Sequence, residues 1–357
     1  MQQNQMTLNH QCLTSFKTLT PHLSCLAANR NLLYAAAFNQ VHVFDLSTRV
    51  HVDSFNAAKP SSGSIKSIAF SGSKVFTAHQ DRKIRVWQIM GAPSRGHRLL
   101  SSLPTLKDRL MRFILPKNYV HVRRHKKRLW IEHSDAVSCL AVNEGLMYSV
   151  SWDKSLKVWD ACENKCLESV NKAHDDAVNA VVVSDDGTVY TASADGAIRV
   201  WEKEEKERRH RLMHVLERHK SGVNALALKD TGDDGLVLFS GGSDRSIGVW
   251  RRDDGCDRME FREALWGHGG AILCLTIVGN DMLLSGSSDR TVRVWRRGEE
   301  GGGYLCVGMM GKHERPVKSL VRVSTSTDDA SENDENDAIT VCSGSLDGEI
   351  KLWEISA

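Results

Sequence analysis

The sequence is poor in proline and has no long apolar run, and each shortage excludes a class of protein. Six prolines in 357 residues are too few for an extended proline-rich disordered chain. The longest nearly unbroken apolar stretch, Ala271–Val278, falls far short of the ~18 residues that a membrane-spanning helix needs. Residues 1–5 do not combine a basic start with an apolar block, so we expect no secretory signal and a protein of the cytoplasm and nucleus.

Motifs for bound metals and nucleotides are missing as well. The nine cysteines include no Cys-x-x-Cys pair, which is the usual zinc-ligand spacing, and their odd number favours free thiols. The sequence has no Gly-x-x-x-x-Gly-Lys-Ser/Thr loop for phosphates and no His-Glu-x-x-His motif. We therefore expect no metal ion, no cofactor, no small-molecule substrate and no membrane association.

Charge is balanced overall but segregated along the chain. The 47 Lys and Arg residues and the 44 Asp and Glu residues give a formal net charge of +3. Residues 90–131 nevertheless contain 11 Lys or Arg and a single acid, Asp108, whereas residues 324–337 contain 6 acids and no base. A nearly neutral body is thus predicted to carry one basic and one acidic appendage.

A repeat with fixed spacing recurs six times. Each copy has a Ser or Thr four residues before an Asp and a Trp six residues after that Asp, and in five copies a His precedes the set. The five complete sets are His133, Ser149, Asp153 and Trp159; His174, Thr191, Asp195 and Trp201; His219, Ser240, Asp244 and Trp250; His268, Ser285, Asp289 and Trp295; and His313, Ser343, Asp347 and Trp353. The sixth set, Thr77, Asp81 and Trp87, has Ser61 where the His would stand.

This repeat resembles that of the WD-repeat family, and the resemblance covers nearly the whole chain. In that family each repeat is one four-stranded blade of a β-propeller. A seventh, degenerate copy spans residues 23–45, with Phe44 in the place of the Trp. Without residues 90–127 and 324–337, the chain holds about 44 residues per blade, within the range expected of such repeats. The predicted fold is all-β, a single seven-bladed propeller of four-stranded antiparallel blades.

The expected blade boundaries follow from the repeat. They are about 20–56, 60–132, 133–170, 174–216, 219–264, 268–309 and 313–357. The last blade lacks an outermost strand after Trp353, and residues 11–16 resemble residues 165–170, which occupy that place in another blade. We therefore predict that residues 11–19 pair into blade 7 and close the ring, which removes an exposed sheet edge.

The recurring His, Ser or Thr, and Asp invite interpretation as a hydrolase triad. The resemblance implies instead that the Trp, the hydroxyl, the His and the Asp form one buried hydrogen-bond chain in each blade. An enzyme needs such a set once, whereas here it is complete five times. Removing one member of a buried chain leaves its neighbours unpaired at a cost of about 1–3 kcal/mol, so a structural role accounts for the repetition. We expect no catalytic residues and no enzymatic activity.

A short helix is predicted inside the basic appendage. Residues 90–127 are expected to interrupt blade 2 between its third and fourth strands, with residues 129–131 as the outer strand. A capping box at residues 105–108 begins the helix and Pro116 ends it. The apolar face of the helix is expected to dock on this propeller, and the rival is a groove on a partner. This face consists of Leu106, Leu110, Phe113 and Ile114.

A run of five fixed positive charges follows the helix, namely Arg123, Arg124, Lys126, Lys127 and Arg128. It is interpreted either as a nuclear-import or phosphate-binding patch or as a solvated hairpin between two strands. In a propeller, connections between third and fourth strands emerge on the same face as those between first and second strands. The acidic residues 324–337 would then share a face with the basic run and weaken any binding of nucleic acid.

The basic appendage also narrows the resemblance. Residues 103–105, 112–113 and 115–119, the basic run and residues 129–133 look like the plant Jingubang-type group of WD-repeat proteins. The resemblance to that group implies a regulatory protein without enzymatic activity that contacts other regulators, transcription factors among them.

Protein binding is predicted on the face that carries the Asp turns. The residue before each turn Asp points toward that surface, and large apolar side chains there are typical of binding hot spots. A cation follows the Asp in four turns, and a solvated turn residue is the simpler interpretation of those charges. Together these side chains suggest an acidic or phosphorylated peptide as the ligand. The predicted protein-binding residues are Trp152, Leu346, Gln80, Arg82, Lys154, Arg245 and Arg290.

Two functions from different classes stay open. The leading prediction is a non-enzymatic scaffold or adaptor for proteins, because each blade repeats its structural residues and varies its loops. The alternative is a factor that associates with chromatin or another nucleic acid through residues 107–128. An enzyme is disfavoured because no unrepeated cluster of acid, base or nucleophile occurs.

Overall fold

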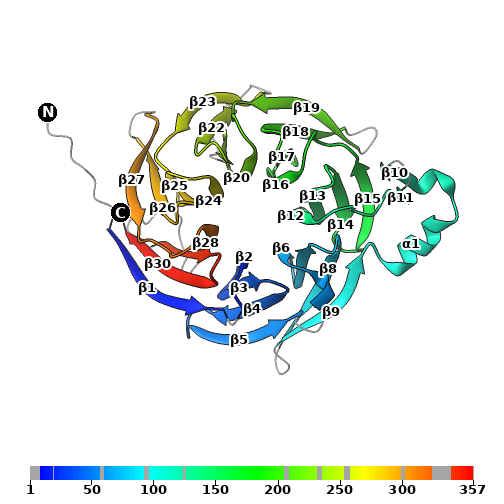
Figure 1. Ribbon diagram of the computed structural model, residues 1–357, viewed down its shortest axis with the longest axis horizontal. Coiled ribbons are helices and arrows are strands. Elements are labelled where there is room, and N and C mark those ends of the chain that lie inside the picture. Colours follow the sequence, from blue (N-terminus) through cyan, green and yellow to red (C-terminus); the bar gives the residue numbers. More distant parts are fainter. Residues whose placement is uncertain are drawn as a thin grey trace.

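The structure, a computed structural model, describes residues 9–18, 20–56, 60–91, 96–123, 126–204, 209–230, 235–252, 258–298, 302–323 and 339–356. These residues form seven four-stranded sheets, arranged as blades around a central axis, and one two-stranded hairpin (Figure 1). Neighbouring strands within each blade pair antiparallel. The seven-bladed all-β propeller predicted from the repeat is confirmed.

Each blade runs from an innermost strand at the centre of the ring to an outermost strand at its rim (Figure 1). Blades 1–3 contain β2 (Leu23–Asn29), β3 (Leu32–Ala37), β4 (Gln40–Asp45) and β5 (Val50–Phe55); β6 (Ile65–Ser71), β7 (Lys74–His79), β8 (Ile84–Met90) and β9 (Gly96–Leu103); and β12 (Val137–Asn143), β13 (Leu146–Ser151), β14 (Leu156–Asp160) and β15 (Lys165–Val170). Blades 4–6 contain β16 (Val178–Val183), β17 (Val189–Ser193), β18 (Ala197–Glu204) and β19 (Arg209–Glu217); β20 (Val223–Asp230), β21 (Leu236–Gly242), β22 (Ile247–Arg252) and β23 (Glu260–Leu265); and β24 (Ile272–Val278), β25 (Met282–Ser287), β26 (Val292–Arg297) and β27 (Tyr304–Met310). Blade 7 contains β28 (Val317–Val323), β29 (Ile339–Ser345), β30 (Glu349–Ser356) and β1 (Asn9–Lys17).

The second strand of each blade reads as a continuous buried run rather than an alternating one. Every residue of β17 and of β25 is buried, because both faces of these strands pack against neighbouring blades. The outermost strands lie at the rim, and β15 accordingly exposes Lys165 and Leu167 while it buries Cys166. The pattern of each strand thus follows from its distance from the centre of the ring.

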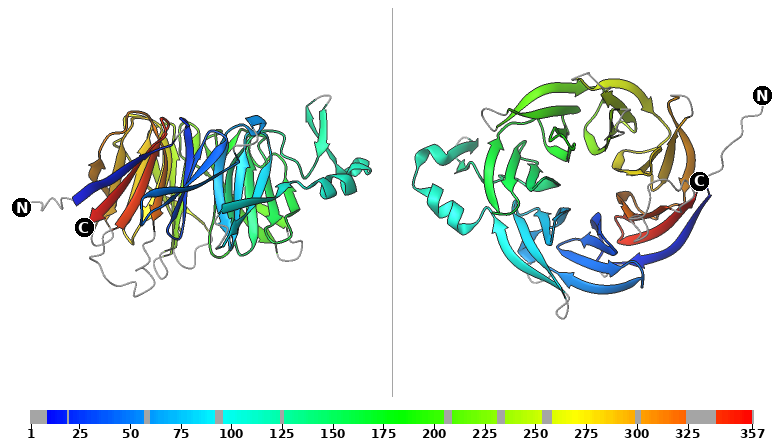
Figure 2. Two further views of the ribbon diagram at one scale, coloured as in Figure 1. Left: turned by 90° about the horizontal axis from the view of Figure 1, so that it is seen from below. Right: turned by 180° about the vertical axis from the view of Figure 1, so that it is seen from behind.

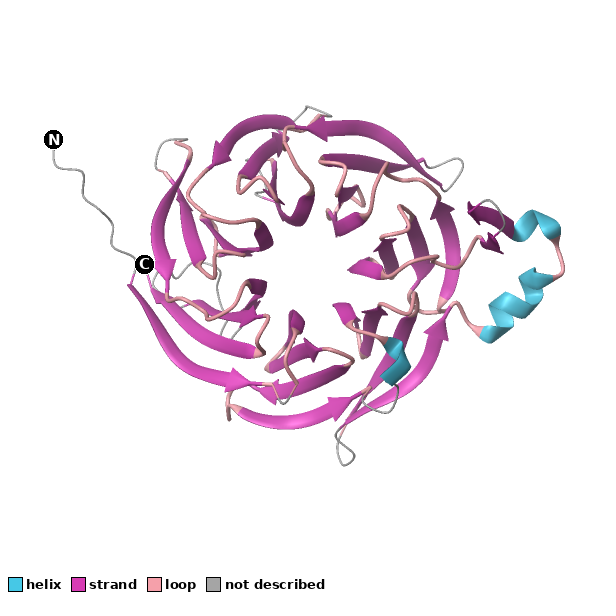
Figure 3. Cartoon of the chain, in the orientation of Figure 1, coloured by secondary structure: helices cyan, strands magenta, loops and turns pink. Residues whose placement is uncertain are grey.

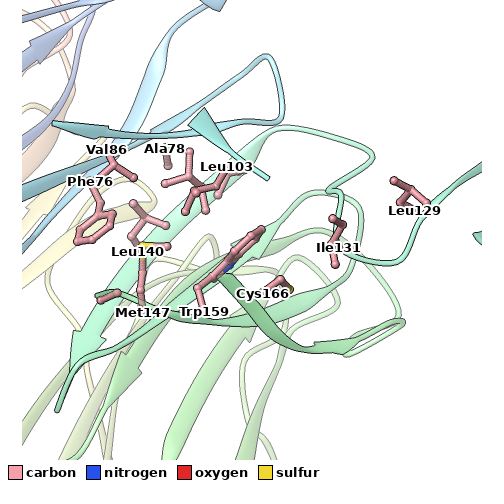
Figure 4. Packing of buried hydrophobic residues seen from close by; sticks show 13 residues of the cluster. Phe76, Ala78, Val86, Leu103, Leu129, Ile131, Leu140, Met147, Trp159 and Cys166 are labelled. Carbon is pink, nitrogen blue, oxygen red and sulfur yellow. The ribbon is translucent and has the colours of Figure 1, made fainter. Parts of the chain in front are cut away.

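The hydrophobic core is divided into seven clusters, one between each pair of neighbouring blades. Figure 4 shows the cluster between blades 2 and 3, where Phe76, Val86 and Leu103 of blade 2 face Leu140 and Trp159 of blade 3. Complete burial of one such side chain contributes about 1.5–3 kcal/mol. Because each blade supplies half of two clusters, a blade has no core of its own, and the ring must close to bury this surface.

The ring is closed by β1, which pairs antiparallel with β30. The register places Gln11 opposite Glu354 and Phe16 opposite Ile350. The outermost strand of blade 7 therefore comes from the start of the chain, while its other three strands come from the end. The predicted closure by an N-terminal strand is confirmed.

The basic appendage does not interrupt blade 2, which corrects the boundary predicted for that blade. Residues 96–103 form β9 and pair with β8, so that Trp87 lies opposite Leu99 and blade 2 is complete at Leu103. Only a short connection separates β8 from β9. Residues 96–103 are therefore nearer along the chain than residues 129–131, and they pair with the free edge of β8. Residues 129–131 therefore do not join blade 2. Leu129 pairs with Tyr119 in a separate hairpin, and Leu129 and Ile131 pack into the cluster between blades 2 and 3.

Leu103 is followed by an insertion between blades 2 and 3 that projects from the rim (Figure 2). Its elements are α1 (Leu106–Phe113), η2 (Pro116–Asn118), β10 (Tyr119–Arg123) and β11 (Lys126–Leu129). The two strands pair only with each other. Among the described residues, helical structure is confined to this insertion and to the single turn η1 (Pro60–Ser62) before blade 2 (Figure 3). None of these helices has the length and apolar character to cross a membrane.

The position of the insertion also decides which face it occupies. Strand direction alternates within a blade, so connections between blades emerge on the same face as the turns between second and third strands. We call this the Asp-turn face. The strands β28 and β29, which flank the acidic residues 324–337, join at the opposite face. The prediction that the acidic and basic appendages emerge on one face is therefore wrong, although the acidic residues themselves lie outside the described residues.

Candidate interaction surface

A chain of hydrogen bonds passes through the interior of each of blades 3–6. The His Nε2 lies 2.8 Å from the Ser or Thr hydroxyl oxygen, to which the Trp indole N–H donates at 2.8–2.9 Å. The His Nδ1 faces a carboxylate oxygen of the turn Asp at 2.8–3.3 Å. The hydroxyl therefore donates to Nε2, and Nδ1–H donates to the carboxylate.

This connectivity matches that of a hydrolytic triad, but burial separates it from solvent. The hydroxyl residues Ser149, Thr191, Ser240 and Ser285 are 0% exposed. Each hydroxyl oxygen already accepts the indole N–H of its blade, and a nucleophile has to come within bonding range of a substrate. These hydroxyls cannot do so, and the chains instead tie the turn Asp to the strands of its blade.

Blade 7 corrects one predicted member of these sets. His313 Nδ1 lies 3.0 Å from Oε2 of Glu349 rather than against Asp347. Asp347 accepts the backbone N–H of Glu349 at 3.0 Å and the hydroxyl of Ser345. The other complete blades have Ser, Ala or Thr at the position of Glu349, and only the longer carboxylate reaches back to the ring.

Blade 2 rebuilds the chain from a histidine that the sequence analysis did not select. His79 Nε2 lies 2.8 Å from the Thr77 hydroxyl, to which the Trp87 indole donates at 2.9 Å. The ring therefore comes from the end of β7, and Ser61, which stands at the usual His position, is exposed. The turn Asp81 instead pairs with the buried Arg85 at 2.6 Å.

Burial favours the neutral ring at His79, His133 and His174. It lowers the pKa of His133 and of His174 despite the opposing effect of the paired Asp. Burial, with a contribution from Arg85, lowers the pKa of His79 to about 2. Burial alone would raise the pKa of Asp153, but His133 and hydrogen bonds to that carboxylate hold it well below its ordinary value. A neutral ring beside an ionised carboxylate is the protonation state that the hydrogen bonds require.

The Asp turns place cations in a backbone conformation that normally favours glycine. The residue after the turn Asp has a positive φ in six blades. These residues are Arg82 (74°), Lys154 (71°), Gly196 (86°), Arg245 (73°), Arg290 (73°) and Gly348 (86°). A side chain in this conformation costs on the order of 1 kcal/mol. Four blades thus retain a cation on the Asp-turn face at a position where glycine is less strained.

Trp152 is the predicted apolar anchor that remains accessible. Its side chain is 40% exposed, and Nζ of Lys66 lies 5.1 Å from the centre of its ring, within range of a cation–π interaction. Leu346 is half-buried in the turn of blade 7. Gln80 is exposed, and its Oε1 accepts the backbone N–H of Ser64 at 3.3 Å.

Lys66 was missed because it lies in an innermost strand, where core residues were expected. The innermost strand of every blade has a β-bulge at the same place. Four bulge residues donate to the backbone of the next blade, namely Ser24, Ser138, Asn179 and Asn224. Blades 2 and 7, on either side of blade 1, have Lys66 and Lys318 at this position. A charged residue where four of the other blades have Ser or Asn and blade 6 has Leu273 is the signal that would have identified them.

The structure brings together only part of the predicted set. Trp152 belongs to blade 3, and Lys66 and Arg82 belong to the adjacent blade 2. Arg82 also lies close enough to the insertion to affect Arg128, because burial and the charge of Arg82 both lower the pKa of Arg128. Arg245 and Arg290 belong to blades 5 and 6 and are separated from this sector by blade 4. The sector of blades 2 and 3 on the Asp-turn face is the candidate interaction surface.

The basic run lies only partly within the described residues. Arg123 and Lys126 belong to the paired strands β10 and β11, although their side chains are not described, and Arg124 lies outside the described residues. Lys127 is exposed and Arg128 is half-buried. The described residues of the run thus belong to a hairpin on the insertion, and they do not connect two strands of blade 2.

The helix of the insertion does not dock its apolar face on the propeller, which corrects the expected packing. No residue of α1 is buried. Leu106, Leu110, Phe113 and Ile114 are 75%, 70%, 66% and 81% exposed. The helix is held by polar contacts with the segment that leads into blade 3, and its apolar face stays exposed.

Four segments of the chain match the family model described as WD domain, G-beta repeat (WD40). The matched segments are residues 125–160, 164–202, 210–251 and 260–296. They cover most of blades 3–6, which are also the blades with the complete His, hydroxyl, Asp and Trp chains. The chain therefore contains WD40 repeats within its seven-bladed propeller.

Curated proteins similar to this chain carry WD repeats in larger contexts. An F-box/WD-40 repeat-containing protein of Arabidopsis thaliana is 24% identical over 62% of this chain and 35% of its own length. An uncharacterized WD repeat-containing protein of Schizosaccharomyces pombe is 27% identical over 40% of this chain and 39% of its own length. The pre-mRNA-splicing factor cwf17 of the same yeast is 30% identical over 29% of this chain and 28% of its own length. The chain thus spans well under half of the length of each of these relatives.

Proposed function

We propose that this protein is a non-enzymatic scaffold that holds an acidic or phosphorylated segment of a partner protein on the Asp-turn face of blades 2 and 3. The observation that carries the proposal is the exposed ring of Trp152 with the ammonium group of Lys66 above it. The ring offers apolar area, and Arg82 and Lys154 lie on turns of the same two blades. An aromatic anchor beside cations is the composition that favours an acidic peptide.

Two lysines in innermost strands of the propeller give a second reason to expect an anionic ligand. Burial lowers the pKa of Lys66, and the charge of Lys318 lowers it again, so the two ammonium groups repel each other. A carboxylate or phosphate bound near Lys66 relieves this repulsion. A phosphoserine carries a charge of about −1.5 to −2 and offers three acceptor oxygens, so it gains more from this site than a single carboxylate does.

The comparisons support a role among protein partners. Propellers with WD40 repeats generally act as platforms for protein interactions, and relatives over part of the chain include a splicing factor and an F-box protein by name. The likeness of the insertion to the plant Jingubang-type group supports a plant regulatory protein of the cytoplasm and nucleus. In this proposal its partners include transcription regulators.

A second candidate function is association with nucleic acid or chromatin through residues 107–128. It is favoured by the exposed Lys127 and by the proximity of Arg128 to Arg82, which gather positive charge on one face. Binding of this kind releases counterions from phosphates, so its affinity would fall steeply as salt rises.

Fluorescence polarisation with the full-length protein tests the proposed function. The probe is a labelled peptide with one phosphoserine flanked by Asp and Glu, and its unphosphorylated form is the reference. We expect saturable binding of the phosphopeptide and a loss of about 30-fold in affinity for Trp152→Ala, equivalent to about 2 kcal/mol. The melting temperature of this variant should match that of the wild type, because the ring is already 40% exposed.

The matched control is Trp266→Ala, since Trp266 is 60% exposed and precedes blade 6 on the same face. We expect the affinity of this control to change less than threefold. Equal losses for both variants, or wild-type affinity in Trp152→Ala, would contradict the proposal. Tight binding of duplex DNA with a steep salt dependence, and none of the phosphopeptide, would establish the second candidate instead.

A further inference from the structure

The helix α1 is amphipathic but is attached to the protein by its polar face. Nε of Arg109 lies 2.7 Å from Oε1 of Glu132, and the guanidinium group of Arg112 lies 5.4 Å from the centre of the Trp130 ring. Both partners belong to the segment that enters blade 3. Amphipathic helices usually turn their apolar face toward the body and their charges toward water. In α1 this arrangement is reversed.

The reversed helix is firmly held. Thr105 caps its N-terminus, because its hydroxyl accepts the backbone N–H of Asp108 at 3.1 Å and donates to the Asp108 carboxylate at 2.8 Å. At the other end, the Asn118 side chain donates to the carbonyl of Arg112 at 2.9 Å, and the Tyr119 hydroxyl donates to the carbonyl of Phe113 at 3.0 Å. Both ends of an eight-residue helix are thus fixed without any burial of its apolar side chains.

The anchored helix presents four apolar side chains with the spacing of a groove-binding motif. Leu106, Leu110, Phe113 and Ile114 lie at positions i, i+4, i+7 and i+8, and each is at least 66% exposed. Burying each of them would contribute about 1.5–3 kcal/mol. Because the helix is already formed and capped, a partner would not have to supply the cost of ordering it.

Cations flank this apolar face at its two ends and indicate the chemistry of the occupant. Lys107 and Lys117 are exposed near its two ends, and Asp108 is the single acid in the basic appendage. A second copy of this chain would bring two strongly positive insertions together. A nucleic acid would leave the apolar side chains unused. Attraction to a membrane surface needs a cluster of several cations, and with Arg109 and Arg112 engaged by Glu132 and Trp130 only Lys107 and Lys117 stay exposed beside the apolar face.

We infer that α1 inserts its apolar face into an apolar groove of a partner protein whose rim carries carboxylates. The interaction uses a surface separate from Trp152, so it stands or falls independently of the proposed function. The helix lies at the rim of the propeller (Figure 1), whereas Lys66 belongs to the innermost strand of blade 2 and Trp152 to a turn of blade 3. One partner could therefore occupy α1 while another segment occupies blades 2 and 3.

Titration with a reference acceptor tests this inference on the full-length protein. The probe is calmodulin, whose calcium-loaded form opens a Met-rich apolar groove that accepts basic amphipathic helices and whose calcium-free form does not open it. The test variant combines Leu110→Asp with Ile114→Asp. The matched control is Leu305→Asp, since Leu305 is 66% exposed on β27 and far along the chain from α1. We expect calcium-dependent, saturable binding by the wild type and the control, and at least a 30-fold loss of affinity in the double variant.

Three outcomes would overturn the inference. The first is the absence of calcium-dependent binding by the wild type, and the second is equal binding by the double variant. The third is an alternative occupant that needs Leu110 and Ile114, which would be seen as binding to phosphatidylserine-containing vesicles or as concentration-dependent dimerisation without binding of calmodulin. A matching melting temperature of the double variant shows that the fold is intact, because both side chains are exposed at the start.

Discussion

At the residue scale, the same four side-chain types recur because each blade has to satisfy the same buried polar groups. In blade 5 the Ser240 hydroxyl lies between His219 Nε2 at 2.8 Å and the indole N–H of Trp250 at 2.9 Å. Departures from the pattern are compensated locally, as by His79 in blade 2 and Glu349 in blade 7. These blades thus share a buried hydroxyl that links the indole N–H to a His ring, and a His from either of two positions can complete this link.

Ser240→Ala tests this view. The substitution leaves the Trp250 indole N–H and His219 Nε2 without their shared partner in the protein interior, at a cost of about 1–3 kcal/mol. We expect the melting temperature to fall by about 2–5 °C, as measured by calorimetry, while binding of the phosphopeptide to blades 2 and 3 is retained. The exposed Ser221→Ala is the control and should change the free energy of unfolding by less than about 0.5 kcal/mol. A Ser240→Ala variant as stable as this control would show that the chain contributes nothing.

At the element scale, the architecture depends on which segment pairs with the free edge of each blade. Blade 2 takes β9 as its edge, which leaves the insertion free to project from the rim. Blade 7 takes β1, whose Leu13 and Phe16 pack against the cluster between blades 7 and 1. An edge strand that is absent leaves unpaired backbone groups and exposes part of the neighbouring cluster.

Deletion of residues 1–17 should therefore destabilise the whole ring. We expect a lower melting temperature and a tendency to self-associate, since β30 becomes an open edge next to a partly exposed cluster. Addition of a synthetic peptide of residues 9–17 to the truncated protein should raise its melting temperature in proportion to the logarithm of peptide concentration. An unchanged melting temperature after deletion, or no response to the peptide, would show that closure by β1 does not stabilise the ring.

At the scale of the whole molecule, the seven shared clusters make the ring one cooperative unit, and the buried histidines couple this unit to pH. Burial lowers the pKa of His133, His174, His268 and His313 in the folded protein. In the unfolded chain a histidine titrates near its ordinary pKa of about 6.5. Between the folded and unfolded pKa values the unfolded state binds more protons, so stability rises with pH in this window.

Stability should consequently fall as the pH is lowered below about 6.5. We expect the melting temperature at pH 5.0 to be lower than at pH 7.5 by about 5 °C or more, because at least four neutral imidazoles must resist protonation together. Replacement of the exposed His22 by Asn should leave this slope unchanged. A melting temperature that stays level or rises toward pH 5.0 would contradict the assignment of these rings as neutral in the folded state.

Most of the fold was predictable, because the repeat spacing reports a local and recurrent requirement. The turn Asp, the hydroxyl and the Trp lie within about ten residues of one another, so the sequence alone reveals each blade and the closing strand. The candidate surface was predictable only in part. Trp152 stood out on its turn, but Lys66, which lies above its ring, comes from the innermost strand of another blade and carries no local signal of that contact.

The sequence by itself determined the seven blades, the buried polar chains of blades 3–6 and the closure by the N-terminal strand, because these depend on spacing within a repeat and on hydrophobic pattern. Only the tertiary structure decided which of two apolar segments completes blade 2, on which face the basic insertion emerges and which way α1 is turned. The physical reason is competition. A free strand edge can pair with only one segment, and a buried surface can be covered by only one. Which segment does so depends on chain connectivity and on distant contacts such as those with Glu132 and Trp130.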